Sequence, residues 1–136
     1  MAVTAIVDTG FLVALLRRRD AHRAWAQEQA ARHPPPWLTC EAVLSESFHL
    51  LGGNGIAELG ELLDLGAVSI AFSLAEHRGP VIALMKKYSR LPMGFADACL
   101  VRMTEVISDC VVLTSDSDFR IYRRYGRRTI PSVLPS

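Results

Sequence analysis

The chain of 136 residues is half hydrophobic and about one fifth charged, a composition that predicts one packed globular domain over residues 1–136 and excludes a disordered chain. Its 15 basic and 14 acidic residues give a net charge of +1, so bulk charge favours no polyanionic partner and any such attraction must come from local patches. The three cysteines, Cys40, Cys99 and Cys110, lack the paired spacing of a zinc site or a disulfide framework, which favours small core residues in a reducing cytosol.

Strand-like and helix-like segments alternate along the first half of the chain. The predicted elements are a strand over 3–7, a helix over 10–18, a helix that is capped by Asp20 and runs to about Arg32, a strand over 37–40, a helix from 39 or 40 to 51, and a helix over 56–65. The prolines at 34–36 end the second helix, and the segment Gly52-Gly-Asn-Gly55 predicts a helix stop and a turn after the third. No basic leader precedes the first strand, and the longest apolar run, 10–16, is too short to span a bilayer. We therefore expect a cytoplasmic protein without a membrane partner.

The second half continues the alternation. Its predicted elements are a strand over 67–72, a helix to about Ser89, a helix over 95–107, a strand over 110–114, a short helix, and a final strand near 128–130. The spacing of Ser73 and Glu76 is that of a capping box and predicts the start of the first of these helices. Such an alternation predicts an α/β fold with a parallel sheet covered by helices.

Four acidic residues stand where the predicted elements begin or end. Asp8 and Asp116 follow the first and fourth strands, Asp97 lies in the first turn of a helix, and Glu46 lies within one. Ligands of open α/β sheets bind outside the carboxyl ends of the strands, so these side chains are expected to face one crevice if the first and fourth strands are neighbours. Carboxylates that close would repel one another unless a cation lay between them, and ligation by oxygen alone selects Mg²⁺ or Mn²⁺.

Each acid also has an ordinary alternative. Asp8 and Asp97 are in positions where aspartate commonly caps a helix or favours its dipole. Glu46 is expected to be buried, which makes it harder to explain, whereas Glu41 lies in a first turn and is assigned to the helix dipole. The two glutamates are five positions apart and cannot share a helix face. After the fourth strand, either Asp116 or Asp118 can cap the short helix, and Asp116 is favoured as the ligand because it lies nearer the strand end.

Four segments, taken in order, resemble the motifs of PIN-domain nucleases. They are Asp8-Thr9 after the first strand, Thr39-Cys-Glu-Ala-Val-Leu-Ser-Glu46, Phe95-Ala-Asp97-Ala, and Thr114-Ser-Asp116-Ser-Asp-Phe. The resemblance spans almost the entire chain, and its length is similar to that of the VapC-like ribonuclease toxins of toxin–antitoxin pairs. One departure is Gly94, where many relatives have another acid.

The resemblance implies a three-layer α/β/α sandwich with a central, mostly parallel sheet, and a metal-dependent endoribonuclease that hydrolyses RNA phosphodiester bonds. The implied catalytic residues are Asp8, Glu46, Asp97 and Asp116, of which Asp8, Asp97 and Asp116 bind Mg²⁺ or Mn²⁺. Hydroxyl groups of Thr9, Thr114 and Ser115 are available to hydrogen-bond the carboxylates or the scissile phosphate, although such residues are more often turn and cap residues. Asp118 is counted with these supporting residues.

The partners follow from charge and from the resemblance. Arg120, Arg123, Arg124 and Arg127 form one stripe for RNA if the short helix continues that far, with a solvated face as the alternative. A second basic patch, 17–19, ends the first helix. The resemblance implies a cognate antitoxin and a homodimer, and the amphipathic segment 56–63 offers either a groove for a partner helix or core packing. The alternatives are a housekeeping RNA-processing nuclease and a catalytically silent interaction domain, and the presence of all four acids argues against the last.

Overall fold

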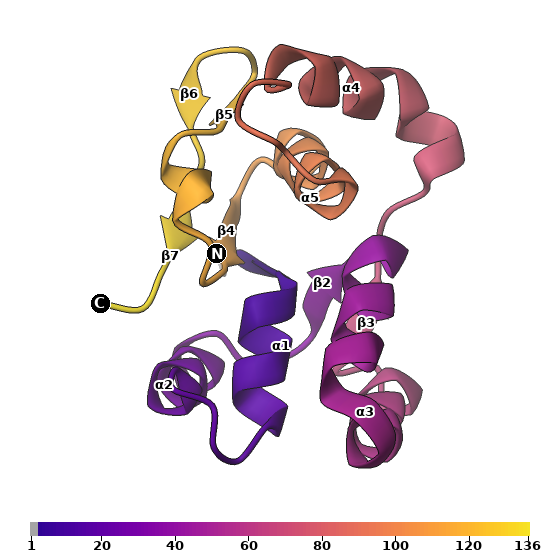
Figure 1. Cartoon of the computed structure of the whole chain (residues 1–136), viewed down its shortest axis with the longest axis vertical. Helices are drawn as coiled ribbons and strands as arrows, with labels where there is room; N and C mark the ends of the chain where they lie inside the picture. The colour runs from indigo at the N-terminus through magenta and orange to yellow at the C-terminus, as the bar shows by residue number, and fades with distance from the viewer. Residues whose placement is uncertain (1–2) are drawn as a thin grey trace.

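The computed structural model describes residues 3–136, which form a sheet covered by helices on both faces (Figure 1). The strands are β1 (Thr4–Val7), β2 (Trp37–Thr39), β3 (Val68–Ile70), β4 (Cys110–Leu113), β5 (Arg123–Arg124), β6 (Arg128–Thr129) and β7 (Ser132–Val133). The helices are α1 (Thr9–Leu16), α2 (Arg23–Arg32), α3 (Glu41–Asp64), α4 (Leu74–Lys87), α5 (Phe95–Val106) and the 3₁₀ helix η1 (Ser117–Arg120). The alternation predicted from the sequence is confirmed.

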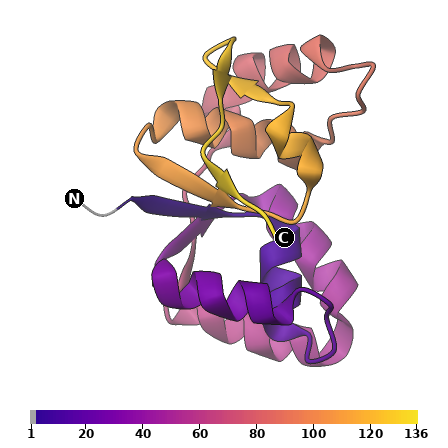
Figure 2. The ribbon, with the colours of Figure 1, turned by 90° about the vertical axis from the view of Figure 1, so that its left-hand side faces the viewer.

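The main sheet is parallel, with the strand order β3-β2-β1-β4-β7. Its central strands β1 and β4 pair in register from Thr4 with Cys110 to Val7 with Leu113. They are nearly continuous apolar runs because both of their faces are covered, as is usual in parallel sheets. Figure 2 shows α1, α2 and α3 on one side of the sheet and α4 and α5 on the other. The structure is therefore the expected three-layer α/β/α sandwich.

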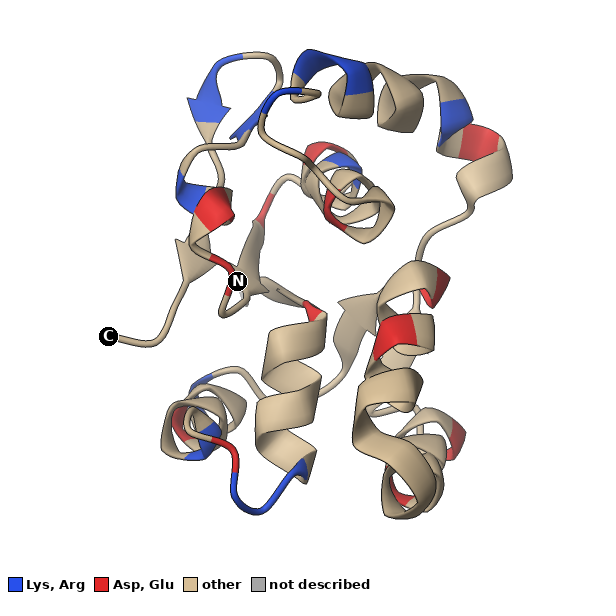
Figure 3. Cartoon of the chain, in the orientation of Figure 1, with Lys and Arg blue, Asp and Glu red and all other residues tan. Residues whose placement is uncertain are grey.

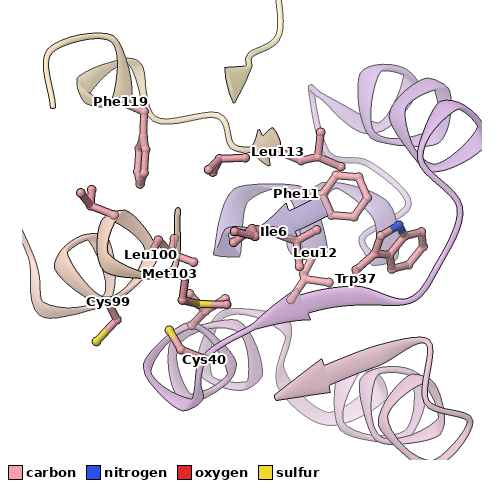
Figure 4. Packing of buried hydrophobic residues seen from close by; sticks show 14 of the residues in the cluster. Ile6, Phe11, Leu12, Trp37, Cys40, Cys99, Leu100, Met103, Leu113 and Phe119 are labelled. Carbon is pink, nitrogen blue, oxygen red and sulfur yellow. The ribbon is translucent and has the colours of Figure 1, made fainter. Parts of the chain in front are cut away.

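The core fills the space between the sheet and both helix layers (Figure 4). On one side the ring of Phe11 meets that of Trp37 edge-on, with their centroids 5.3 Å apart. On the other side Leu100, Met103 and Phe119 pack against the sheet. These buried contacts hold α1 and α5 on opposite faces, and the first turn of each helix reaches the carboxyl edge of the central strands.

Helix α3 joins two segments that the sequence predicts as separate helices. Its interruption lies at Gly52, where φ is +71° and ψ is −158°. Glycine adopts this conformation without strain because it has no Cβ, so the chain needs only this residue to change direction before the helix resumes. The position of the break is confirmed, whereas the predicted turn of several residues is wrong.

Two predicted helix caps differ from the structure. Asp20 does not cap α2. Its Oδ1 accepts the backbone N–H of His22 at 2.9 Å, and the helix begins at Arg23. The capping box of Ser73 and Glu76 is also wrong, because the Ser73 side chain makes no capping bond and the N–H of Glu76 donates to the Ser73 carbonyl at 3.1 Å. At α2 the N–H of Arg23 donates to the Asp20 carbonyl at 3.2 Å, so in both places a backbone carbonyl accepts an N–H of the first helical turn.

The carboxyl-terminal segment folds differently from the predicted strand near 128–130. Strands β5 and β6 form a small antiparallel hairpin, whose turn uses positive φ at Tyr125 (55°) and Gly126 (84°). The edge strand of the main sheet is instead β7, which pairs with β4 through Val112 and Ser132. The prediction of a final strand in the sheet was thus displaced by a few residues, because the hairpin takes up 123–129.

Two expectations from composition concern the cysteines and the membrane. All three cysteines are buried, which confirms them as core residues, and the fold brings Cys40 and Cys99 to the same small pocket. Within residues 3–136, no helix has the length and apolar character needed to cross a membrane.

Candidate active site

Asp8 lies at the carboxyl end of β1, beside the end of β4. Its backbone N–H donates to the Leu113 carbonyl at 3.0 Å, and its side chain is 7% exposed. One carboxylate oxygen accepts the N–H of Thr9 at 2.7 Å, and the other accepts the hydroxyl of Thr114 at 2.7 Å. Asp8 therefore caps α1, as its ordinary role requires, and also faces the edge of the sheet from a fixed orientation.

Asp97 is held in the first turn of α5. Its Oδ2 accepts the N–H of Gly94 and the hydroxyl of Tyr122, each at 3.3 Å. Tyr122 is buried, and its ring packs edge-on against Tyr88 and Phe119. Nothing in the sequence spacing indicates that the Tyr122 hydroxyl reaches a carboxylate 25 positions earlier.

Asp116 follows β4 and caps η1. Its Oδ1 accepts the N–H of Asp118 at 2.9 Å, and its own N–H donates to the Thr114 hydroxyl at 3.0 Å. Thr114 thus joins the loop of Asp116 to the side chain of Asp8. Asp118 contributes backbone groups to η1 and is not among the residues lining the cleft, and its supporting role stays a prediction.

Glu46 reaches the same region from α3, but the premise that singled it out is wrong. The residue is exposed, whereas Val43 and Ser47 on the neighbouring face of α3 are buried. The Thr9 hydroxyl lies 3.5 Å from Glu46 Oε2, a weak contact that leaves the carboxylate free to move. Glu41 does not line the cleft and occupies the first turn of α3 as expected.

All four acids line one cleft of about 520 Å³. Its remaining walls come from the loop after α1, the end of the first part of α3, the loop before α5 and the loop after β4. The other lining residues are Thr9, Gly10, Val13, Asp20, His22, Leu50, Pro92, Gly94, Phe95, Ala96 and Ser115. Asp20 and His22 also line the cleft, although neither was among the predicted site residues.

Gly10 allows two walls of the cleft to approach closely. A Cβ at this position would lie 2.0 Å from the Ser115 Oγ, so the first turn of α1 and the loop after β4 need a glycine at their contact. Ser115 is exposed and lines the cleft, in line with its predicted supporting position. The requirement for Gly10 depends on Ser115, far away in the chain, and sequence spacing does not reveal it.

The cleft concentrates negative charge without a cationic side chain to offset it. The ion pairs within residues 3–136 join Arg32 to Glu28 and Arg102 to Glu105, away from the four acids. Burial raises the pKa of Asp8 to about 6, with smaller contributions from the charges of Asp97 and Asp116. Burial likewise raises the pKa of Asp97 to about 6, and Asp116 and Glu46 add repulsion. The expected mutual repulsion is therefore present.

The donor set fits a hard divalent cation, although a complete binding group is not preformed. Among residues 3–136, no three Asp, Glu, His or Cys side chains are already arranged to hold a metal ion. The cleft acids nevertheless offer oxygen ligands only, and a cation bound there would favour the charged forms of Asp8 and Asp97, whose pKa values are raised by burial and by the neighbouring acids. The exposed Glu46 side chain can rotate toward the other acids.

The predicted arginine stripe does not exist as a helix face. Helix η1 ends at Arg120, Arg123 and Arg124 lie in β5, and Arg127 follows in the hairpin turn. The Arg124 guanidinium donates to the carbonyls of Thr104 and Ser108 at 3.0 Å each, so it mainly fastens β5 to the end of α5. The prediction failed because it assumed that the short helix continued. Contact of these arginines with RNA stays a prediction.

Basic residues nevertheless gather at this end of the molecule. We call this surface the basic end, and its members are Lys86, Lys87, Arg90, Arg120, Arg123, Arg127 and Arg128. Figure 3 shows blue segments on η1, the hairpin, the end of α4 and the loop after it. Lys87 Nζ donates to the Gly126 carbonyl at 2.8 Å, which ties α4 to the hairpin. The contribution of α4 was not predicted, because its lysines are far from the arginines in the chain.

Comparison with known proteins yields a family and a fold. Residues 5–125 match the family model of the PIN domain. The crystal structure of VapC20 from Mycobacterium tuberculosis, described as a sarcin-ricin loop cleaving toxin, superposes with a TM-score of 0.77 at 23% sequence identity. The match covers 92% of this chain and 99% of that one. No curated protein matched in sequence.

Proposed function

The chain belongs to the PIN-domain family, and from this premise we propose that it is a metal-dependent endoribonuclease. The observation that carries the proposal is the cleft in which Asp8, Glu46, Asp97 and Asp116 meet without a cationic side chain. Hydrolysis of a phosphodiester requires relief of negative charge and an activated water, and a site rich in carboxylates is suited to hold the cation for that chemistry.

The environments of the four acids suggest different roles. Asp8 and Asp97, which are fixed by hydrogen bonds and have raised pKa values, would be the principal ligands of Mg²⁺ or Mn²⁺, with Asp116 beside them. When bound, the ion would offset charge on the phosphodiester and make a bound water more acidic. Glu46 is exposed and only weakly held, so its carboxylate can orient the attacking water and accept its proton.

The basic end supports RNA as the substrate. Arg120 lies four residues beyond Asp116, and Arg90 lies two residues before Pro92 at the cleft wall, so basic side chains continue from the cleft toward the hairpin. A phosphate backbone would be attracted along this path, whereas the cleft alone would repel it in the absence of metal. The net charge of +1 gives no indication of this arrangement, because the positive charge of the basic end and the negative charge of the cleft nearly cancel in the sum.

We further propose that the enzyme is the toxin of a VapC-like toxin–antitoxin pair that acts in the cytoplasm. The fold match to VapC20, described as a toxin, supports this choice over a housekeeping RNA-processing nuclease. A cognate antitoxin covering the cleft and a homodimer belong to the same proposal. A catalytically silent interaction domain is disfavoured, since such a domain has no need to retain all four acids in one cleft.

The test is cleavage of defined RNAs by the purified protein with and without Mg²⁺. We expect cleavage only with the metal, leaving a 5′ phosphate and a 3′ hydroxyl. Asp97→Asn should lower kcat by at least about a hundredfold, because even partners of metal ligands typically contribute 10–100-fold. Gel mapping of product ends checks both results, and Asp109→Asn, an exposed aspartate outside the cleft, is the matched control. Undiminished cleavage by Asp97→Asn in Mg²⁺ would overturn the proposal.

A further inference from the structure

A small, mostly apolar pocket of about 240 Å³ lies beside the acidic cleft. Its lining residues are Cys40, Glu41, Ala42, Phe72, Leu74, Phe95 and Cys99. Phe95 and Leu74 are 42% and 41% exposed, although large apolar side chains of this kind usually pack into a core. The pocket has no part in the catalytic roles assigned above.

Phe95 connects this pocket to the cleft. It is the first residue of α5 and lines both cavities, two positions before Asp97. Because Phe95 lines both cavities, an RNA bound with a phosphate in the cleft would have an adjoining nucleotide within reach of the Phe95 side chain. Single-stranded RNA is commonly recognised by bases that leave the stack and lie on aromatic side chains.

The opposite wall of the pocket is held in place by a chain of polar contacts. The Phe72 ring stacks on the ring of His77, with centroids 5.1 Å apart and an interplanar angle of 19°. Arg102 Nε donates to His77 Nδ1 at 3.2 Å, and Arg102 forms an ion pair with Glu105 at 3.1 Å. The pocket is thus a preformed slot, smaller than the cavities that bind drug-sized ligands and suited to one flat ring system.

Glu41 supplies the polar group of the slot. It is exposed, lies in the first turn of α3, and forms no ion pair within residues 3–136. A carboxylate accepts hydrogen bonds through two oxygens and donates none. Among the nucleobases, guanine presents two parallel N–H donors, on N1 and N2, that match such a pair of acceptors.

We propose that this slot binds a guanine next to the scissile phosphate, with the base stacked on Phe95 and its N1–H and N2–H donating to Glu41. The inference rests on the proposed ribonuclease activity and deepens it. The substrate is then an unpaired RNA segment with guanine at one defined position beside the cut, which is a narrower class than RNA in general.

The experiment uses the full-length protein with a pool of single-stranded RNAs randomised around one site, and cleavage positions are read by sequencing. The wild type is expected to prefer guanine at one flanking position. Glu41→Gln should reduce that preference roughly tenfold, the size typical of a lost bidentate base contact. Phe95→Leu should weaken the selection of that nucleotide by removing the stacking surface.

Inosine at the same position isolates the contact, because it lacks only the N2 amino group. The wild type should cut the inosine substrate more slowly than the guanine substrate, whereas Glu41→Gln should cut the two at similar rates, since the interaction is already lost. Glu76→Gln is the matched control, because Glu76 is also an exposed glutamate in a first helical turn but does not line the slot. It should retain the wild-type preference.

The outcomes separate this inference from the proposed function. Guanine binding in the slot would be overturned if the wild type cleaved RNA without base preference beside the cut, or if Glu41→Gln kept the full guanine preference. Either result would leave the proposed ribonuclease activity standing. Absence of all cleavage would overturn the proposed function, and this inference with it. A change in sedimentation of Phe95→Leu with unaltered base preference would assign the pocket to contact between copies of the chain and overturn base binding.

Discussion

The two ends of α5 carry acids in opposite circumstances. At its start, Asp97 receives two hydrogen bonds of 3.3 Å, faces three other carboxylates and has a pKa raised to about 6. At its end, Glu105 forms an ion pair with Arg102 at 3.1 Å and accepts the N–H of Tyr125 at 2.8 Å. Nearby carbonyls at this end are bound by Arg124.

This difference shows what each end does for the molecule. The network around Glu105 pairs its carboxylate with Arg102 and with the N–H of Tyr125, and it fastens the β5–β6 hairpin to α5. The site around Asp97 leaves charge uncompensated, which lowers stability unless a ligand arrives. One helix therefore combines an end that stabilises the fold with an end that gains stability when a ligand binds. Removing the charge of the acid at each end should change the free energy of unfolding of the metal-free protein in opposite directions.

The largest expected effect is the response of activity to pH at limiting Mg²⁺. Protonation of Asp8 and Asp97 removes ligands from the cation, so kcat/KM should fall by about tenfold per pH unit below roughly pH 6. Additional Mg²⁺ should move this acid limb of the pH profile, the range in which kcat/KM falls, to lower pH, because metal and protons compete for the same oxygens. Rate profiles at low and high Mg²⁺ measure the shift, and a limb that does not respond to Mg²⁺ would contradict it.

Stability of the metal-free protein should change with pH in the opposite direction. Both folded-state pKa values, about 6, lie above the reference value of 3.8, so the folded state binds protons more tightly within that window. The free energy of unfolding attributable to these groups should therefore rise as pH falls from about 7 toward 4. Mg²⁺ should stabilise the protein more at neutral pH than at pH 5, which thermal unfolding with and without the ion can test.

The next effect concerns single substitutions at the two ends of α5. Glu105→Gln should lower the free energy of unfolding by about 1–2 kcal/mol, because it weakens a partly buried pair and a hydrogen bond to backbone. Asp97→Asn should raise it in metal-free buffer, since it removes a repelled carboxylate. Urea unfolding at neutral pH measures both changes.

Glu28→Gln is the control for this pair of variants. Its ion pair with Arg32 has side chains that are 57% and 66% exposed, so little change in stability is expected. A loss of stability in Asp97→Asn equal to that in Glu105→Gln would show that the two ends do not differ in the proposed way.

Local sequence patterns predicted most of the fold because β1, β4 and α5 are strongly apolar and alternate with clear stops. Asp8 and Asp116 could be assigned because a parallel sheet brings the ends of neighbouring strands together. Glu46 was selected for burial, yet it is exposed and reaches the cleft through the direction of α3. The prediction of its position holds although the reason for it was wrong.

Contacts between distant segments account for what the sequence did not reveal. The approach of Gly10 to Ser115 and the meeting of α4 with the hairpin depend on tertiary packing. The arginine stripe failed for a local reason, because η1 is a single short 3₁₀ turn and Arg123 is already in a strand. Hydroxyl groups that orient carboxylates are equally difficult to predict, and Tyr122 is the clearest example.

The smallest effect expected at the cleft is that of Tyr122→Phe. The hydroxyl of Tyr122 donates to Asp97 and opposes the rise of that pKa, so its removal should move the acid limb of kcat/KM to higher pH. The rate at neutral pH should fall by roughly tenfold, near the lower limit for loss of a group that orients a ligand. Phenylalanine keeps the ring contacts with Tyr88 and Phe119, so the fold should be retained.

Tyr88→Phe is the matched control, because the Tyr88 hydroxyl accepts the N–H of Arg123 and contacts no cleft carboxylate. A shift of the limb in Tyr122→Phe but not in Tyr88→Phe would show that the hydroxyl acts through Asp97, whereas equal profiles would reduce Tyr122 to a packing residue.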